Sequence, residues 1–339
     1  MKFLVVGLGS MGKRRIRCLK ALGHERNVLG FDLREDRRRE VEEKYGTQTF
    51  ADFSKAFQEV QPTTLIISVP PAHHHEYMKF AAENRCHFFV EASVVDTNMD
   101  RIKELSKKAG IVAAPSATLV FHPAIRKIAE IVQSKQLGQI SNIMLHSGQY
   151  LPDWHTYEQV SDYYVSNPAT GGAREIVPFE LTWVTHLFGF PKSVTGYNRR
   201  TVTIKGAEKI DDTYNFLLEY DNCLASITID VVSRFATRRL LINGDQRQLV
   251  WDWTSKMIRI YDPQSSQWTE IPYEMESAAP GYNANIDENM YIDELRSFLT
   301  AIETKNPFVN TLENDHKVLK LLYTIEESDK KSQHLPFQE

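Results

Sequence analysis

The sequence predicts an α/β protein of two domains, in which a doubly wound α/β domain precedes an α+β domain. Two observations predict this arrangement. Apolar strands alternate with helices over the first 115 residues, and after Pro115 the pattern changes to strands joined by hairpin turns, with helices at the C-terminal end. The chain has 339 residues, which suits two domains of the usual ~100–200 residues. We expect the first domain over residues 1–118 and the second over residues 119–339.

The N-terminal domain is predicted from five apolar strands and the helices between them. The strands are expected at Lys2–Val6, Asn27–Asp32, Leu65–Val69, His87–Glu91 and Ile111–Ala114. The helices are expected at Ser10–Leu22, Arg34–Tyr45, His75–Asn84 and Met99–Ala109. Apolar strands separated by helices indicate a parallel sheet with helices on both of its faces.

The second domain is predicted from hairpins. Turn residues at 221–222 and 243–245 each separate two apolar segments, a pattern typical of antiparallel strand pairs. The expected strands are Tyr214–Tyr220, Leu224–Val231, Arg239–Ile242, Gln248–Trp253, Met257–Tyr261 and Trp268–Ile271. The expected helices are Pro123–Gln136, Glu288–Thr304 and Leu312–Ser328, and residues 272–287 are expected to form a long loop. An antiparallel or mixed sheet with helices follows.

Composition excludes several classes of partner. The net charge is −4 and no basic patch occurs, which argues against nucleic acid as a partner. No segment approaches the roughly 18 apolar residues that cross a bilayer, so we expect no membrane partner. The three cysteines are far apart and odd in number. This indicates neither a disulfide framework nor a zinc site, and it favours a cytoplasmic location.

A glycine turn follows the first strand and opens the first helix. Residues 7–12 read Gly-Leu-Gly-Ser-Met-Gly, and Asp32 stands 20 residues after Gly12, at the end of the next strand. Gly7 permits the tight turn, Gly9 lets a pyrophosphate approach the backbone, and Gly12 lets the helix pack on the strand. The helix N-terminus at Ser10 and Met11 offers N–H groups to phosphate. The pattern predicts a Rossmann dinucleotide-binding domain.

Asp32 also predicts which dinucleotide binds. Its carboxylate would accept hydrogen bonds from the ribose hydroxyls and would repel a 2′-phosphate, so NAD is expected and NADP less so. Four arginines follow it and leave an alternative open. One of them could hold a 2′-phosphate, or all four could belong to a solvated helix face paired with neighbouring glutamates; they are Arg34, Arg37, Arg38 and Arg39.

Several stretches together resemble the glucose-fructose oxidoreductase / inositol dehydrogenase / MocA family. They are the glycine turn, Val69–His74, Phe89–Glu91, the helix from Pro123 with residues 137–140, Gly171-Gly172 and Leu187–Gly189. The resemblance implies a Rossmann domain, then an α+β domain with a large open, mainly antiparallel sheet. That sheet often forms an oligomer face, so a homodimer or homotetramer is expected. The resemblance also implies an NAD-dependent dehydrogenase of a sugar, a cyclitol or a sugar derivative. It implies cofactor contacts at Val69, Pro70, His74 and Glu91.

Two positions depart from the family pattern. The family carries Glu-Lys-Pro where this chain has Glu91-Ala92-Ser93, so the lysine is absent. The family also places an aspartate and then an acid/base histidine after its glycine pair. Here Glu175 could stand for the aspartate, no histidine follows at the expected place, and Glu180 is the nearest titratable residue.

A base must therefore come from another residue, because oxidation of a carbinol needs a group that takes the hydroxyl proton. The candidates for proton transfer are Glu180, His155 and Glu175. Glu180 lies in an apolar segment, where it either pairs with Arg174 or faces a cleft with a raised pKa. His155 is either a base or a surface histidine.

Residues 146–180, which contain these three candidates, also supply candidates for substrate binding. They are Tyr150 and Trp154, whose rings could stack on a sugar, and Arg174, which could bind a phosphate or carboxylate or serve as the partner of Glu180. The run His73–His75 does not point at one centre, so no metal site is expected. Because the lysine and histidine are missing, a cofactor-binding sensor without turnover is the alternative function. A reductase of a conjugated or imine-like substrate also remains open.

Overall fold

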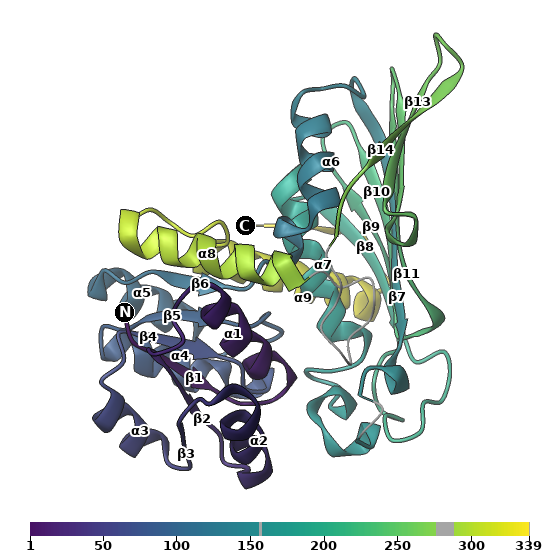
Figure 1. The fold of residues 1–339 in the computed structure, drawn as a ribbon. Helices are drawn as coiled ribbons and strands as arrows, with labels where there is room; N and C mark the ends of the chain where they lie inside the picture. The colour runs from purple at the N-terminus through teal and green to yellow at the C-terminus, as the bar shows by residue number, and fades with distance from the viewer. Residues whose placement is uncertain (156–157, 276–287, 339) are drawn as a thin grey trace. The chain divides into compact units, whose positions relative to one another are not determined.

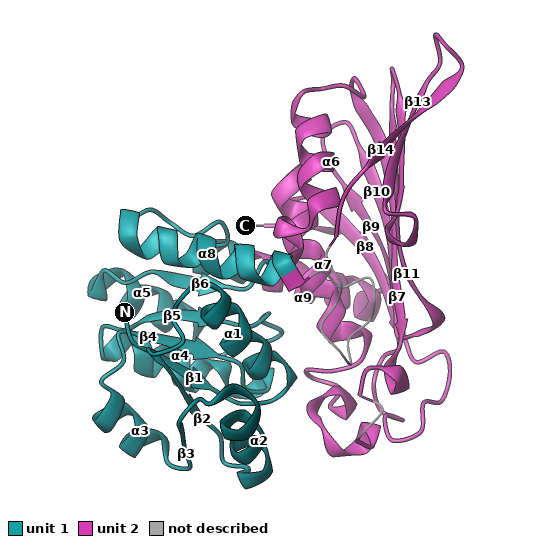
Figure 2. Cartoon of the chain, viewed as in Figure 1, with its two compact units in different colours: residues 1–118, 289–316 teal, residues 119–288, 317–339 magenta. Residues whose placement is uncertain are grey.

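The computed structural model describes residues 1–155, 158–275 and 288–338 and consists of two compact units. Unit 1 comprises residues 1–118 and 289–316, and unit 2 comprises residues 119–288 and 317–339 (Figure 2). The expected range of 119–339 for the second domain is therefore wrong for residues 289–316. Most of the loop expected at 272–287, residues 276–287, lies outside the described residues.

Unit 1 contains a six-stranded parallel sheet in the order β3-β2-β1-β4-β5-β6 (Figure 1). The strands are β1 (Phe3–Val6), β2 (Val28–Phe31), β3 (Thr49–Phe50), β4 (Thr64–Ile67), β5 (His87–Val90) and β6 (Ala113–Pro115). The helices are α1 (Ser10–Ala21), α2 (Glu35–Tyr45), α3 (Phe53–Val60), α4 (His74–Glu83), α5 (Met99–Ala109) and α8 (Glu288–Thr304). This confirms the predicted Rossmann sheet, whose order reverses between β1 and β4 and so brings the carboxyl ends of those strands to the ligand-binding edge.

Helix α8 belongs to unit 1 because its buried face packs on β5. The ring of Phe298 lies 5.9 Å from that of Phe89, and Phe308, which follows α8, lies 6.4 Å from Phe89. Glu294 accepts a hydrogen bond from the backbone N–H of Ala117 at 2.6 Å. An amphipathic pattern predicts that one helix face is buried, but it does not say which domain buries it.

Unit 2 contains a nine-stranded sheet among its described residues, in the order β14-β13-β12-β11-β7-β10-β9-β8-β15. Among the described strands of this sheet, only β7 and β10 pair in parallel, which confirms a mainly antiparallel sheet. The strands are β7 (Ile140–Tyr150), β8 (Ser193–Arg199), β9 (Thr213–Glu219), β10 (Leu224–Asp230), β11 (Val232–Gly244), β12 (Gln248–Asp252), β13 (Met257–Asp262), β14 (Gln267–Pro272) and β15 (Leu335–Pro336). Its helices are α6 (Pro123–Gln133), α7 (Ala173–Phe188) and most of α9 (Leu312–Lys331).

The two faces of this sheet differ in their environment. Residues that alternate toward the helices are buried, such as Phe216 and Leu218 on β9. Leu217, between them, is 51% exposed, and Met144 on β7 is 53% exposed. Apolar side chains therefore remain uncovered on the face opposite the helices.

Candidate active site

The glycine turn between β1 and α1 has no room for side chains at two positions. A Cβ on Gly12 would lie 1.8 Å from the carbonyl oxygen of Gly7. Gly7 has φ of +90°, and a Cβ there would lie 2.7 Å from the carbonyl oxygen of Ser68. Gly9 is the N-cap of α1 and has no side chain to cap this end of the helix. The residues fit a dinucleotide because the turn leaves space where a Cβ would otherwise lie, and a helix N-terminus has positive potential for a phosphate.

Asp32 follows β2 and ties the turn to that strand. Its Oδ2 accepts a hydrogen bond from the backbone N–H of Leu8 at 2.7 Å, and its Oδ1 accepts one from Arg34 at 2.8 Å. Each carboxylate oxygen retains a lone pair, so both can still accept a ribose hydroxyl. The aspartate therefore shapes the turn as well as offering acceptors to a nucleotide.

The four arginines that follow Asp32 are not equivalent. Arg34 pairs with Asp36 at 2.6 Å, Arg39 pairs with Glu35 at 2.9 Å, and Arg38 donates to backbone carbonyls. Arg37 alone of the four lies at the turn: its Nη1 is 3.7 Å from Oδ2 of Asp32 and 3.5 Å from the Cβ position of Gly9.

A neutral histidine lies just after β4. Nε2 of His74 is 2.8 Å from the carbonyl oxygen of Val69, to which it donates, and burial lowers the pKa of His74 to about 4. Nδ1 of the ring is buried, and no described residue donates a hydrogen bond to it. Pro70 links β4 to the short turn before α4. The orphaned Nδ1 is an acceptor that suits an amide or hydroxyl donor of a bound cofactor.

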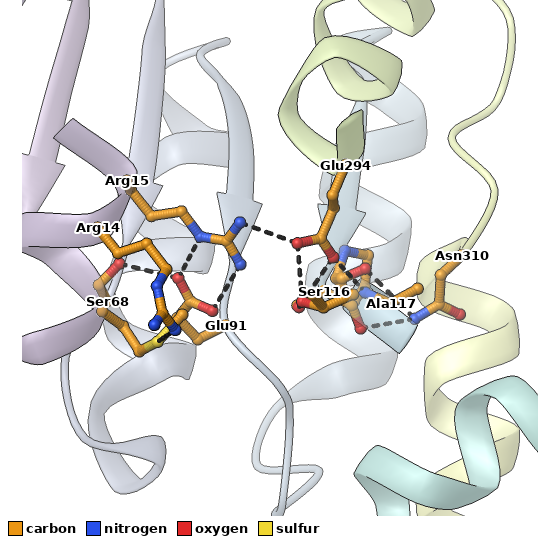
Figure 3. A network of polar contacts seen from close by, with 11 residues as sticks. Arg14, Arg15, Ser68, Glu91, Ser116, Ala117, Glu294 and Asn310 are labelled. Carbon is orange, nitrogen blue, oxygen red and sulfur yellow. Dashed lines mark hydrogen bonds and ion pairs between the residues drawn. The ribbon is translucent and has the colours of Figure 1, made fainter. Parts of the chain in front are cut away.

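Glu91 follows β5 and forms two hydrogen bonds with Arg15 of α1 (Figure 3). Nε of Arg15 lies 2.7 Å from Oε1 of Glu91, and Nη2 lies 2.9 Å from Oε2. Ser68, at the end of β4, donates to Oε1 at 3.2 Å. Burial alone would lower the pKa of Arg15, but Glu91 and Glu294 outweigh it and hold that pKa well above its ordinary value. No sequence pattern predicts this contact, because Arg15 resembles any polar residue of an amphipathic helix.

Glu180, in the described part of unit 2, is buried in an ion pair and does not face a cleft. The side chain is 0% exposed and accepts hydrogen bonds from Ser147 (2.8 Å), Trp183 (2.6 Å) and Arg238 (2.6 Å). Its partner is thus Arg238. The ion pair with Arg174, one of the two alternatives for Glu180, is wrong. A carboxylate that is enclosed and bonded by three side chains serves the fold, and this counts against the expectation that Glu180 is the base.

Arg174 has a partner of its own. Its Nε lies 2.6 Å from Oε1 of Glu326 on α9, and its Nη1 donates to the carbonyl oxygen of Ala169. Tyr214 donates to the same oxygen of Glu326 at 3.0 Å. The guanidinium of Arg174 is therefore ion-paired within unit 2, with Glu326 and not with Glu180.

Glu175, in the first turn of α7, has the buried carboxyl and the raised pKa that were one of the alternatives for Glu180. The hydroxyl of Tyr164 donates to Oε1 at 2.6 Å, whereas Oε2 is buried without a hydrogen-bond partner among the described residues. Burial raises the pKa of Glu175 to about 7, and the hydrogen bond from Tyr164 opposes that rise. A carboxyl group with this pKa exchanges its proton near neutral pH.

The described residues between β7 and α7 include short helical turns at Leu151–Asp153, Val160–Asp162 and Tyr164–Ser166. Nδ1 of His155 lies 3.0 Å from Oε1 of Glu158, and its ring stacks on Tyr163 with centroids 4.8 Å apart. Nε1 of Trp154 is buried, and no described residue accepts its proton. At the end of β7, the guanidinium of Arg234 lies 3.9 Å above the ring of Tyr150.

The described residues contain no group of three or more histidine, cysteine, aspartate or glutamate side chains that could hold a metal ion. In the run of histidines, Nδ1 of His73 lies 3.1 Å from Glu76, whereas Nε2 of His74 bonds to Val69. None of the described helices is both long enough and apolar enough to span a membrane.

Comparison with known proteins agrees with this geometry. Residues 1–116 match the model of an oxidoreductase family with an NAD-binding Rossmann fold, and residues 125–250 match the model of the GFO/IDH/MocA C-terminal domain. The chain is 21% identical to myo-inositol 2-dehydrogenase of Thermotoga maritima over 97% of this chain and 96% of the relative.

Solved structures share the whole fold. A levoglucosan dehydrogenase in complex with NADH and levoglucosan superimposes with a TM-score of 0.85 at 14% identity, over 100% of both chains. A probable dehydrogenase from Thermotoga maritima superimposes with a TM-score of 0.80 at 19% identity, over 99% of both chains.

Proposed function

The chain belongs to the GFO/IDH/MocA family of NAD-binding oxidoreductases, and we propose that it is a dehydrogenase of a sugar, a cyclitol or a sugar derivative with Glu175 as its acid/base group. The observation that carries this proposal is the geometry of the Glu175 carboxyl: Tyr164 donates to Oε1 at 2.6 Å, and Oε2 is buried without a hydrogen-bond partner among the described residues. Burial raises the pKa of this group to about 7, which agrees with that role. The substrate class is supported by relatives named for myo-inositol and levoglucosan.

Bound NAD supplies a hydride acceptor for the carbon that is oxidised. The protein must then remove one proton from the substrate hydroxyl as the C–H hydride leaves, so that an alcohol becomes a carbonyl. In its ionised form Glu175 accepts that proton on Oε2, the oxygen without a hydrogen-bond partner among the described residues. Tyr164 holds Oε1 and so fixes the orientation of the carboxylate.

Aromatic side chains of the same unit suit a polyhydroxylated substrate. The ring of Trp154 offers an apolar face, and its Nε1 is a buried donor that no described residue satisfies. A substrate hydroxyl could accept that hydrogen bond, and we propose this role for Trp154. His155 remains the second candidate for the acid/base group, with Glu158 as the residue that orients its ring.

The test is incubation of the purified protein with NAD⁺ and a panel of cyclitols, hexoses, anhydrosugars and sugar acids, while the absorbance of reduced cofactor is followed. Accumulation of NADH with a member of the panel supports the proposal. Absence of turnover with the whole panel, in either direction, would contradict it.

A second function, that of an NAD(H)-binding sensor, is favoured by one departure from the family's sequence pattern. Ala92 follows Glu91 where the family carries a lysine, so no ammonium is available there to polarise a substrate oxygen. A sensor that binds NAD(H) without turnover needs no such group. It would bind NADH and yet show no hydride exchange between labelled NADH and unlabelled NAD⁺ in the presence of the panel.

A further inference from the structure

We propose that Arg15 is a positioning residue for the cofactor, because it fixes the carboxylate of Glu91 at the edge of the sheet where the nicotinamide half binds. The inference rests on the proposed contact between Glu91 and the cofactor. It assigns to Arg15 a role that the glycine turn and Asp32 do not supply.

The contact between the two side chains constrains both of them. Two parallel N–H···O bonds, of 2.7 and 2.9 Å, join the planar guanidinium of Arg15 to the planar carboxylate of Glu91. This fork geometry fixes the plane of the carboxylate as well as its distance. Ser68 donates to Oε1 as a third bond at 3.2 Å. The carboxylate remains 14% exposed, so it is held but not enclosed.

The far side of the same guanidinium is fixed by α8. Nη1 of Arg15 lies 2.8 Å from Oε2 of Glu294, and both side chains are fully buried. Glu294 in turn accepts hydrogen bonds from Ala117 (2.6 Å) and Ser116 (2.9 Å), as Figure 3 shows. It also accepts one from the hydroxyl of Thr118 (2.8 Å). Arg15 is therefore clamped between two carboxylates and cannot turn away from Glu91.

The position of Arg15 in the chain links this clamp to the cofactor site. Arg15 stands three residues after Gly12 on α1, the helix whose N-terminus receives the diphosphate, whereas Glu91 follows β5. Asp32, which marks the adenosine half, follows β2, and β2 lies on the opposite side of β1 from β5 in the sheet order. Loosening Glu91 should thus weaken contacts to the nicotinamide half and leave the adenosine half unchanged.

The test measures the Kd of two probes, NADH and ADP, by calorimetry on the full chain. ADP lacks the nicotinamide riboside and reports only on the adenosine diphosphate site. Arg15→Lys keeps the charge but cannot form the fork, and we expect it to raise the Kd of NADH by about tenfold while that of ADP changes less than about twofold. Glu91→Gln should give the same split, and the double variant should be no worse than Glu91→Gln alone.

Glu294→Gln removes the charge of the other carboxylate on the same guanidinium, so it should raise the Kd of NADH in the same direction as Arg15→Lys. The matched control is Arg17→Lys, the same change on the same helix at a guanidinium that donates to the hydroxyl of Tyr45. It should leave both Kd values within about twofold of wild type. If Arg15→Lys does not fold, Ser68→Ala removes another donor to Glu91, and it should raise the Kd of NADH but not of ADP.

Equal weakening of NADH and ADP in Arg15→Lys, or no weakening of either, would overturn the positioning role while NAD binding stands. A wild-type chain that binds ADP but not NADH would overturn both this inference and the proposed function.

Discussion

The hydroxyl of Tyr164 donates a 2.6 Å hydrogen bond to Oε1 of Glu175, whose other carboxylate oxygen is buried without a hydrogen-bond partner among the described residues. The two groups act on the acid in opposite directions. Burial raises the pKa of Glu175 to about 7, and the bond from Tyr164 lowers it, because the phenol stabilises the ionised form. The pair therefore sets the pH at which this carboxyl group can take a proton.

Replacing Tyr164 tests that balance. Tyr164→Phe removes the stabilising donor, so the pKa of Glu175 should rise and a larger share of the groups should be protonated at neutral pH. Oxidation needs the ionised base, so the acidic limb of the kcat profile should move to higher pH. The profile is measured over the neutral range with the best substrate of the panel. An unshifted limb would show that another group titrates in it.

Asp32 and Arg37, the two side chains beside the glycine turn, should govern the choice between NADH and NADPH. Wild type should bind NADH more tightly than NADPH, because Asp32 accepts the ribose hydroxyls and repels a 2′-phosphate. Arg37 lies 3.7 Å from Asp32. Arg37→Ala should therefore weaken NADPH further, by about tenfold, and change NADH less. Fluorescence titration with both cofactors measures this, with Arg39→Ala as the exposed control. Equal affinity for the two cofactors in wild type would mean that Arg37, not Asp32, governs the choice.

Glu180 is expected to matter for stability. Removing one partner of a buried ion pair leaves the other charge uncompensated, which costs about 3–5 kcal/mol. Glu180→Gln should lower the free energy of unfolding in urea on that scale, because Arg238 is buried beside it. The double variant Glu180→Leu/Arg238→Met should recover much of the loss. Wild-type stability in Glu180→Gln, together with lost turnover, would return Glu180 to the active site.

The uncovered sheet face predicts assembly. Met144, Leu217 and Tyr197 expose apolar surface on the face opposite the helices of unit 2, and such patches mark interfaces. We expect a homodimer or homotetramer in light scattering at micromolar concentration, and Leu217→Glu should shift it toward the monomer. The exposed Leu224→Glu, on the neighbouring strand end, tests whether the interface extends that far. A monomeric mass for wild type would contradict assembly through this face.

The cofactor turn could be predicted from the sequence because its parts are local. The three glycines lie within six consecutive residues and each is required by a contact inside the turn, such as that between Gly12 and Gly7. Asp32 follows from the length of one helix and one strand. The expected elements of the Rossmann sheet were recovered for the same reason, but β3, a strand of two residues, is too short to produce a periodic pattern.

The surroundings of Glu175 and Glu180 could not be predicted in this way, because they depend on contacts between residues that are distant in the sequence. Arg238 reaches Glu180 because it pairs with Ser147 across β7 and β11, and that register is not visible in either strand alone. The segment after Gly172 forms the helix α7, with Pro178 inside it. Helix geometry turns Glu175 and Glu180 to different surroundings: Glu180 pairs with Arg238, whereas Glu175 accepts a hydrogen bond from Tyr164.

The most direct test of the account is the turnover of Glu175→Gln on a substrate that wild type oxidises, measured as NADH formed per second at saturating NAD⁺. The amide keeps the shape of the side chain and cannot take a proton. The account predicts a loss of about 10²–10⁴-fold in kcat, with the Kd of NADH unchanged, since the cofactor turn and Asp32 lie in unit 1 and Glu175 lies in unit 2. Wild-type kcat in Glu175→Gln would contradict it and would make His155 the leading candidate.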